Sequence, residues 1–135
     1  MDKVLLIGEP MELLLAEEDG ALSDVTHFRA SVSGAEINVA VGLARLGLCP
    51  RFLTRLGSDP RASRIRRFMN ANGISDDLII TDPLHVTGAM MKSKAEPGKH
   101  EFYYFRQDSA ASFLCESDVD GIDLSDIRAV HFTGI

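Results

Sequence analysis

The chain has 135 residues, of which 45% are hydrophobic and 25% charged, and its formal net charge is −6. This balance predicts one globular domain, or part of a larger one, with a hydrophobic core that needs neither disulfides nor metal. The negative charge disfavours binding of nucleic acid or anionic lipid, and favours small-molecule chemistry or a protein partner. The two cysteines, Cys49 and Cys115, lack the spacing of a metal site or redox pair. With no signal peptide and no membrane span expected, a cytoplasmic protein is predicted.

The first elements predict a strand followed by a hairpin. Residues 4–7 form an apolar run ended by Gly8, which is typical of a strand buried on both faces of a parallel sheet. Residues 11–16 are apolar, residues 17–20 predict a turn, and residues 26–32 alternate as a half-buried strand does. We expect a small hairpin here.

The middle of the chain predicts two helices separated by a strand. Residues 35–46 have helical length and period between Gly34 and Gly47, and are apolar nearly all round, as in a helix buried against a sheet. Residues 50–56 predict a strand, and residues 57–60 a turn that caps the next helix. That helix, over residues 61–72, is amphipathic, and its four arginines are expected to form a solvated face.

The remaining segments predict a second hairpin and a final strand. Residues 78–81 read as a short strand, and residues 86–93 and 101–106 as extended segments joined by a turn. Residues 128–133 have the composition of a buried strand, and no helix follows them to cover it. We therefore expect an incomplete α/β unit.

Gly34 and Asn38 are the first candidate site. A helix N-terminus presents unpaired N–H donors, Gly34 allows close approach of a ligand, and Asn38 offers both a donor and an acceptor. Together they suit a polyhydroxylated ligand. The alternative, favoured by spacing alone, is that Asn38 ties neighbouring backbone, because a buried polar group left unpaired costs roughly 1–3 kcal/mol.

The aromatic strand near residues 100–106 is the second candidate. A period of two places Phe102, Tyr104 and Arg106 on one face, with Tyr103 and Phe105 on the other. Both faces need cover, which a ligand cleft on one side and a partner subunit on the other would provide. Arg106 could bind a substrate carboxylate. A core strand ending in a solvated arginine is the simpler interpretation of these residues alone.

Other chemistry is not indicated. The four histidines have no cysteine or acidic neighbour at ligand spacing, so no metal site is predicted. The sequence lacks a G-x-x-x-x-G-K-[ST] phosphate loop, and Gly8-Glu9-Pro10 is not a dinucleotide fingerprint. No nucleotide-binding or catalytic residue is therefore identified in this chain.

Several segments together resemble the N-terminal part of PfkB-type (ribokinase-like) carbohydrate kinases. They are residues 34–47 (GAEINVAVGLARLG), residues 54–60 (TRLGSDP), residues 8–10 (GEP), residues 87–90 (TGAM) and residues 104–112 (YFRQDSAAS). Within the family, these segments are most similar to those of 2-keto-3-deoxygluconate kinases.

The resemblance implies a ribokinase-like α/β sandwich with a small β lid near residues 11–33 and 86–107. It also implies that residues 1–135 are the N-terminal portion of one domain, and that the complete protein associates with itself through the lid. By this resemblance, the chain is expected to bind a sugar or sugar acid. Gly34 and Asn38 are expected to bind its hydroxyls, Met90 to line the pocket, and Tyr104 and Arg106 to hold the acid sugar.

By the same resemblance, ATP, Mg²⁺ and the catalytic Asp belong to a C-terminal portion that this sequence does not contain. This chain alone is then predicted to be inactive. Fructokinase or another PfkB sugar kinase is an alternative, as is a non-catalytic sugar-binding or dimerisation module.

Overall fold

The chain folds as two four-stranded sheets, with two helices packed on the first. Within residues 2–96 and 98–134, which the computed structural model describes, the elements are, in order, β1 (Lys3–Ile7), β2 (Met11–Asp19), β3 (Phe28–Ser33), α1 (Ala35–Arg45), β4 (Cys49–Gly57), α2 (Pro60–Ala71), β5 (Ile79–Asp82), β6 (Ala89–Lys94), β7 (Phe102–Phe105), the 3-10 helices η1 (Ala110–Phe113) and η2 (Glu116–Asp118), and β8 (Ile127–His131).

The first sheet has the order β5-β4-β1-β8, with every pair of neighbouring strands parallel. Its central strand β1 buries Val4, Leu5 and Leu6. This confirms the predicted strand at residues 4–7, whose side chains need cover on both faces of the sheet.

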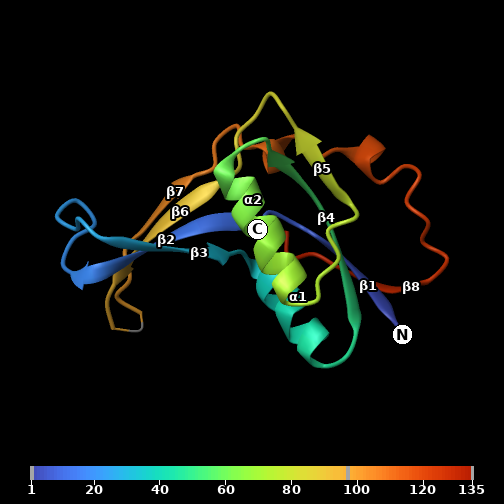
Figure 1. The fold of residues 1–135 in the computed structure, drawn as a ribbon, viewed down its shortest axis with the longest axis horizontal. Coiled ribbons are helices and arrows are strands. Elements are labelled where there is room, and N and C mark those ends of the chain that lie inside the picture. The colour runs from blue at the N-terminus through green and yellow to red at the C-terminus, as the bar shows by residue number, and fades with distance from the viewer. Residues whose placement is uncertain (1, 97, 135) are drawn as a thin grey trace.

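Both helices pack on this sheet, and they occupy the centre of Figure 1, with β4 and β1 to their right. Leu6 and Phe52 of the sheet pack in one cluster with Ile37 of α1 and with Ile65 and Met69 of α2. The 3-10 helix η1 also lies against β4. The connection from β7 to β8 thus helps to cover β4, although it contains only short 3-10 turns.

The helix ends follow the predicted signals. α1 ends at Arg45, and Gly47 has a positive φ of 83°, the left-handed conformation expected after a helix. At the start of α2, the Asp59 carboxylate accepts a hydrogen bond from the Ala62 N–H at 2.9 Å, and Pro60 occupies the first turn. Both predicted helices are confirmed to within a residue or two.

The second sheet has the order β3-β2-β6-β7 and projects to the left of the helices in Figure 1. β2 pairs with β3 and β6 with β7, both antiparallel, so the two predicted hairpins form. The hairpins join through parallel pairing of β2 with β6. Its own core is small and consists of Ala16, Leu22 and Val25, with Phe28 and Met91 packed against them.

Two expectations about these elements were wrong. β2 continues through the acidic residues 17–19, predicted as a turn, because Asp19 still pairs with Lys94 of β6. The arginines of α2 are more than a solvated face: Arg61 and Arg64 both form ion pairs with Glu12 of β2. β8 has the composition of a buried strand, and Val130 is exposed, as expected for a strand that no following helix covers.

Candidate functional site

A pocket of about 450 Å³ lies where the end of β1, the start of α1 and strand β7 meet. This volume is in the usual range for small-ligand sites. The pocket is lined by Ile7, Gly8, Glu9, Met11, Ser33, Gly34, Ala35, Glu36, Asn38, Tyr104, Arg106, Phe132 and Gly134. Four of the five side chains or backbone positions predicted as a site therefore converge here, from segments far apart in sequence.

Gly34 forms the floor of the pocket at the N-terminus of α1. Its φ is +150°, and a Cβ atom at this position would lie 2.8 Å from the backbone oxygen of Glu9. A larger residue would therefore clash with the turn after β1. Because Gly34 has no side chain to cap α1, the N–H groups of the first helical turn point toward the pocket without a side-chain partner.

Asn38 lies one turn further along α1, and its side chain is exposed at the pocket. Its backbone N–H donates to the Gly34 carbonyl at 3.2 Å, as helix geometry requires. Within the described residues, its side-chain amide makes no hydrogen bond. The alternative in which Asn38 ties neighbouring backbone is therefore wrong, and the amide is available to a ligand.

Tyr104 and Arg106 supply the opposite wall from β7 and the residue just after it. Tyr104 is 50% exposed, and the Arg106 side chain is 37% exposed. The Arg106 guanidinium is not merely solvated, because its Nη2 lies 2.6 Å from Oε2 of Glu9. Arginine has five N–H donors, so this pairing leaves others for a ligand.

Met90 is the one predicted site residue that does not line this pocket. It lies opposite Tyr104 in the β6–β7 register and opposite Leu13 in the β2–β6 register, so all three occupy one face of the second sheet. The Met90 side chain is buried. Its role in the pocket stays a prediction.

Two carboxylates in the pocket were not singled out from the sequence. Glu9 accepts a hydrogen bond from the Ser109 hydroxyl at 2.6 Å in addition to pairing with Arg106. Glu36 accepts one from the Thr133 N–H at 3.0 Å, and a Cβ atom on Gly8 would overlap its carboxylate. The sequence signal for Glu36 was an acidic residue in the first turn of an otherwise apolar helix. For Glu9 it was an acidic residue just after a buried strand.

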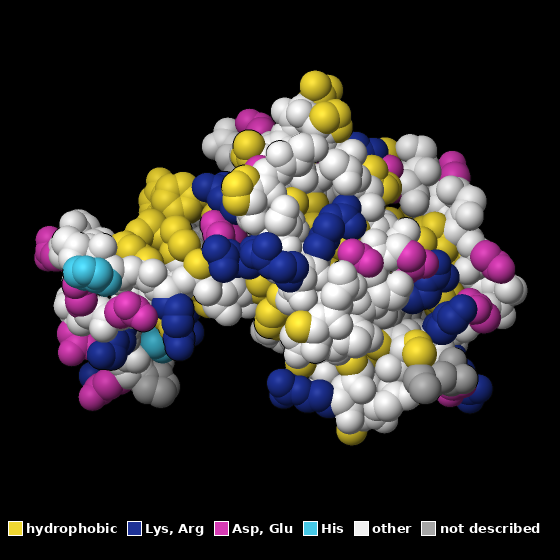
Figure 2. Space-filling model, in the orientation of Figure 1, with side chains coloured by type: hydrophobic (Ala, Val, Ile, Leu, Met, Phe, Trp, Pro, Cys, Tyr) yellow, Lys and Arg dark blue, Asp and Glu magenta, His cyan; other side chains and the backbone are white. Residues whose placement is uncertain are grey.

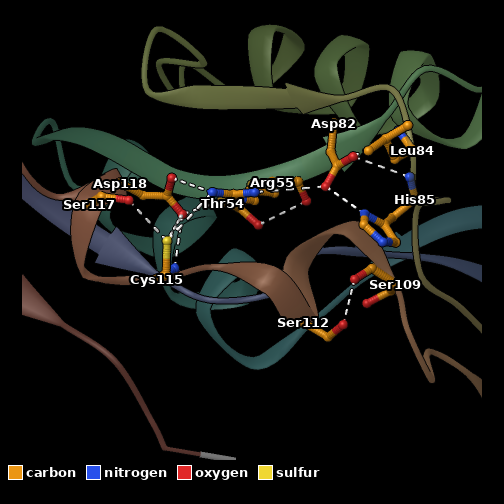
Figure 3. Close-up of polar contacts among 10 residues, drawn as sticks. All are labelled: Thr54, Arg55, Asp82, Leu84, His85, Ser109, Ser112, Cys115, Ser117 and Asp118. Carbon is orange, nitrogen blue, oxygen red and sulfur yellow. Dashed lines mark hydrogen bonds and ion pairs between the residues drawn. The ribbon is translucent and has the colours of Figure 1, made fainter.

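A separate polar cluster lies along β4 and β5, outside the residues that line the pocket (Figure 3). Arg55 binds both carboxylate oxygens of Asp118, at 2.8 and 2.7 Å. Asp82 lies 2.8 Å from Nδ1 of His85, whose ring stacks on Phe113 at 3.7 Å. These contacts fasten the β7–β8 connection to the first sheet.

The cluster's carboxylates are held in their charged form. The hydrogen bond from Arg55 lowers the pKa of Asp118, and the hydrogen bond with His85 lowers the pKa of Asp82. Both shifts follow from partners that stabilise an ionised carboxylate. The structure gives these groups a fastening role rather than a place in the pocket.

Within residues 2–96 and 98–134, no group of three or more His, Cys, Asp or Glu side chains is arranged to hold a metal ion. Nor is any helix there long and apolar enough to cross a bilayer.

Comparison with known families decides the class of protein to which this pocket belongs. The family model described as pfkB family carbohydrate kinase matches residues 1–135. The chain belongs to the PfkB family. The resemblance predicted from the Gly34 and Tyr104 segments is thus confirmed at the level of the family.

The relatives of this PfkB chain include kinases for different sugars. It is 33% identical over 129 residues to a 2-dehydro-3-deoxygluconokinase of Bacillus subtilis, covering 95% of this chain and 40% of that protein. It is 32% identical over 117 residues to a fructokinase of Escherichia coli, covering 87% of this chain and 36% of that protein. The chain thus spans well under half the length of these curated relatives.

Solved structures of PfkB proteins share the fold. The crystal structure of a PfkB protein from Polaromonas sp. superposes with a TM-score of 0.90 and 37% sequence identity, covering 97% of this chain and 44% of that chain. This agreement confirms the predicted ribokinase-like α/β fold, of which this PfkB chain contains a partial, N-terminal portion.

Proposed function

We propose that this chain is the sugar-binding portion of a kinase that transfers the γ-phosphoryl group of ATP to a hydroxyl of 2-keto-3-deoxygluconate or a similar sugar acid. One observation carries the proposal: the uncapped N-terminus of α1 and the Arg106 guanidinium face the same pocket from opposite walls. Such a pocket pairs donors for sugar hydroxyls with a cation for a carboxylate.

Each pocket residue receives a role in this proposal. Backbone N–H groups near Gly34 and the amide of Asn38 bind hydroxyls, since the amide has both donor and acceptor atoms. Tyr104 packs against the sugar and Arg106 binds its carboxylate, while Met90 supports Tyr104 from the same sheet face. The second sheet serves as a lid over the sugar.

Phosphoryl transfer itself is assigned to residues of the complete protein. The reaction depends on positioning, on stabilising charge at the transferring group and on a base that orients the hydroxyl. When bound to the complete protein, ATP would supply the phosphoryl group, and Mg²⁺ would offset negative charge on its phosphates. None of the described residues is assigned a role toward Mg²⁺ or ATP. We expect the 135-residue chain alone to be inactive, and the complete protein to work in the cytoplasm.

A coupled assay tests the kinase proposal. The full-length protein is supplied with ATP and with 2-keto-3-deoxygluconate, fructose or ribose in turn. We expect the highest kcat/KM for the sugar acid. Failure to phosphorylate any sugar would overturn the proposal.

Substitution of Arg106 tests the acid assignment. Arg106→Ala is expected to weaken sugar-acid binding by about 10-fold or more, because a charge-assisted hydrogen bond contributes roughly 1.5–3 kcal/mol. Fructose binding should change far less. Arg67→Ala, which removes an exposed arginine of α2, is the matched control. Equal losses for acid and neutral sugars in Arg106→Ala would contradict the assignment.

A neutral sugar is the second candidate substrate, as in a fructokinase. Its support is that Arg106 is already paired with Glu9 at 2.6 Å, so none of the described residues that line the pocket is an unpaired cation. The assay above distinguishes the two, since a fructokinase would give its highest kcat/KM with fructose.

Association through the second sheet is proposed for the complete protein. Hydrophobic side chains gather on this sheet where β6 and β7 lie (Figure 2). The rings of Tyr103 and Phe105 on β7 are exposed and lie 4.9 Å apart. Register places these rings on the sheet face opposite Tyr104. Exposed aromatic patches of this kind are typical of protein interfaces.

Sedimentation measurements test this association. Tyr103→Ser with Phe105→Ser should convert an oligomer of the full-length protein to a monomer, whereas Phe113→Ser should not. If the full-length protein binds sugar in calorimetry without phosphorylating it, a non-catalytic binding module is supported instead.

A further inference from the structure

Glu9 is the counter-ion of Arg106 inside the pocket. Its Oε2 lies 2.6 Å from Arg106 Nη2, and its Oε1 accepts the Ser109 hydroxyl at 2.6 Å. The Glu9 side chain is only 11% exposed. Both carboxylate oxygens are therefore bound to the segment that follows β7, which carries the opposite wall of the pocket.

Packing fixes where this carboxylate lies. A Cβ atom on Gly88 would lie 2.4 Å from Glu9 Oε1, and one on Gly34 would lie 2.8 Å from the Glu9 backbone oxygen. Ser109 is fully buried. The Glu9 carboxylate is thus confined beside Arg106 by contacts with Gly34, Gly88 and Ser109, which belong to three separate segments.

The charges that line the pocket do not favour an anion overall. They are the carboxylates of Glu9 and Glu36 and the guanidinium of Arg106. Glu36 is bound by the N–H of Thr133 and by no cation within the described residues. A ligand carboxylate that binds a second N–H of Arg106 would therefore lie close to the like charge of Glu9, which weakens the attraction.

We propose that Glu9 determines charge specificity in this pocket: its carboxylate opposes Arg106 and limits the preference for acid over neutral sugars. The inference rests on the proposed function, in which the pocket binds a sugar, and it goes further by naming the residue that sets the balance. Arg106 attracts the acid, and Glu9 sets by how much.

The main test is Glu9→Gln in the full-length protein. Glutamine keeps the size and an acceptor oxygen for Arg106, but removes the charge. Calorimetry compares 2-keto-3-deoxygluconate with its methyl ester, which differ in the carboxylate charge. We expect the ratio of acid to ester affinity to rise roughly 3- to 10-fold, as expected from removing a like charge about 5 Å away in a partly aqueous site.

Glu12→Gln is the matched control. Glu12 is about as buried as Glu9 and is also paired with arginines, Arg61 and Arg64, but it does not line the pocket. The same chemical change there should leave the acid-to-ester ratio as in the wild type.

Arg106→Ala gives a second test that does not require Glu9→Gln to fold. With its counter-ion gone, Glu9 should repel the acid, so the ester should bind more tightly than the acid. Adding Glu9→Gln to Arg106→Ala should then bring the two affinities close together. Equal binding of acid and ester by Arg106→Ala alone would show that the charge of Glu9 does not reach the ligand.

The outcomes separate this inference from the proposed function. If the wild type binds the acid but Glu9→Gln leaves the acid-to-ester ratio unchanged, the inference is overturned and the proposed function stands. Loss of both ligands in equal proportion would assign Glu9 a purely structural role, and also overturns the inference. If the wild type binds neither ligand, the proposed function fails and the inference fails with it.

Discussion

The two sheets of this protein are stabilised in different ways. The first sheet buries large side chains of β1 and β4 against two helices, and Phe52 at its centre is fully buried. In the second sheet, every side chain of β7 is substantially exposed. The pocket therefore has one wall fixed by close packing and another wall that depends on a smaller core.

Ion pairs join the second sheet to the first. Glu9, after β1, pairs with Arg106 after β7, and Glu12 at the start of β2 pairs with Arg64 of α2 at 3.0 Å. Half-exposed ion pairs contribute less than buried apolar contacts. We expect the wall that carries Tyr104 to move more readily than the wall that carries Gly34.

The largest expected effect contrasts one phenylalanine from each sheet. Phe52→Ala should lower the free energy of unfolding by about 3–5 kcal/mol, because it leaves a cavity in a closely packed core. Phe102→Ala, at a side chain 46% exposed, should cost less than about 1 kcal/mol. Urea denaturation of both variants measures the difference. Similar losses would show that the second sheet is packed as firmly as the first.

The next effect concerns the rigid wall. Gly34→Ala should weaken sugar binding by about 10-fold or more and lower stability by roughly 1–3 kcal/mol, because φ is positive and Cβ meets the Glu9 backbone. Gly42→Ala is the control within the same helix. Nothing lies within 4 Å of a Cβ atom there, so that change should stabilise the protein by about 0.5–1 kcal/mol. Calorimetry and thermal unfolding measure both variants.

A third prediction concerns the connection that leaves the second sheet. Asp118→Asn should lower stability at pH 7 by about 1–3 kcal/mol, because it removes the charged partner of Arg55. Arg55 lowers the pKa of Asp118 in the folded state, so its stabilisation is present above the ordinary carboxylate pKa near 3.8. It is lost as pH falls below that value. The difference between wild type and variant should therefore shrink in denaturation curves below about pH 4, and a constant difference would contradict the assignment.

The smallest effect belongs to the ion pairs between the sheets. Glu12→Gln should lower stability by about 1 kcal/mol or less, since its arginine partners are partly exposed to solvent. The loss should decrease further in 1 M salt, because screening weakens such pairs. A loss of stability as large as that in Phe52→Ala would contradict the expectation that these ion pairs contribute less than the apolar core of the first sheet.

Local sequence signals were sufficient for most elements. Gly34 and Gly47 bracket α1, and Asp59-Pro60 begins α2, because helix ends depend on residues next to them. The extent of β2 was not predictable in this way. Whether a strand continues or is covered depends on neighbours distant in sequence, such as Lys94 for Asp19.

The site residues also differ in whether local sequence predicts them. Gly34 and Asn38 lie on one helix and were found together, whereas their meeting with Tyr104 and Arg106 was inferred from the family pattern. Glu9 belongs to that pattern, but the sequence predicted no role for it. Its significance comes from contact with Ser109, 100 positions away, and no local periodicity reveals such a contact.

The parallel pairing of β2 with β6 has a consequence for the order in which the molecule assembles. During synthesis β2 can pair with β3 at once, but its other neighbour emerges only after α1, β4, α2 and β5. Contacts between such distant segments form late, because a long loop must first be closed. The helix end that presents Gly34 is thus available early, and the wall that carries Arg106 forms later.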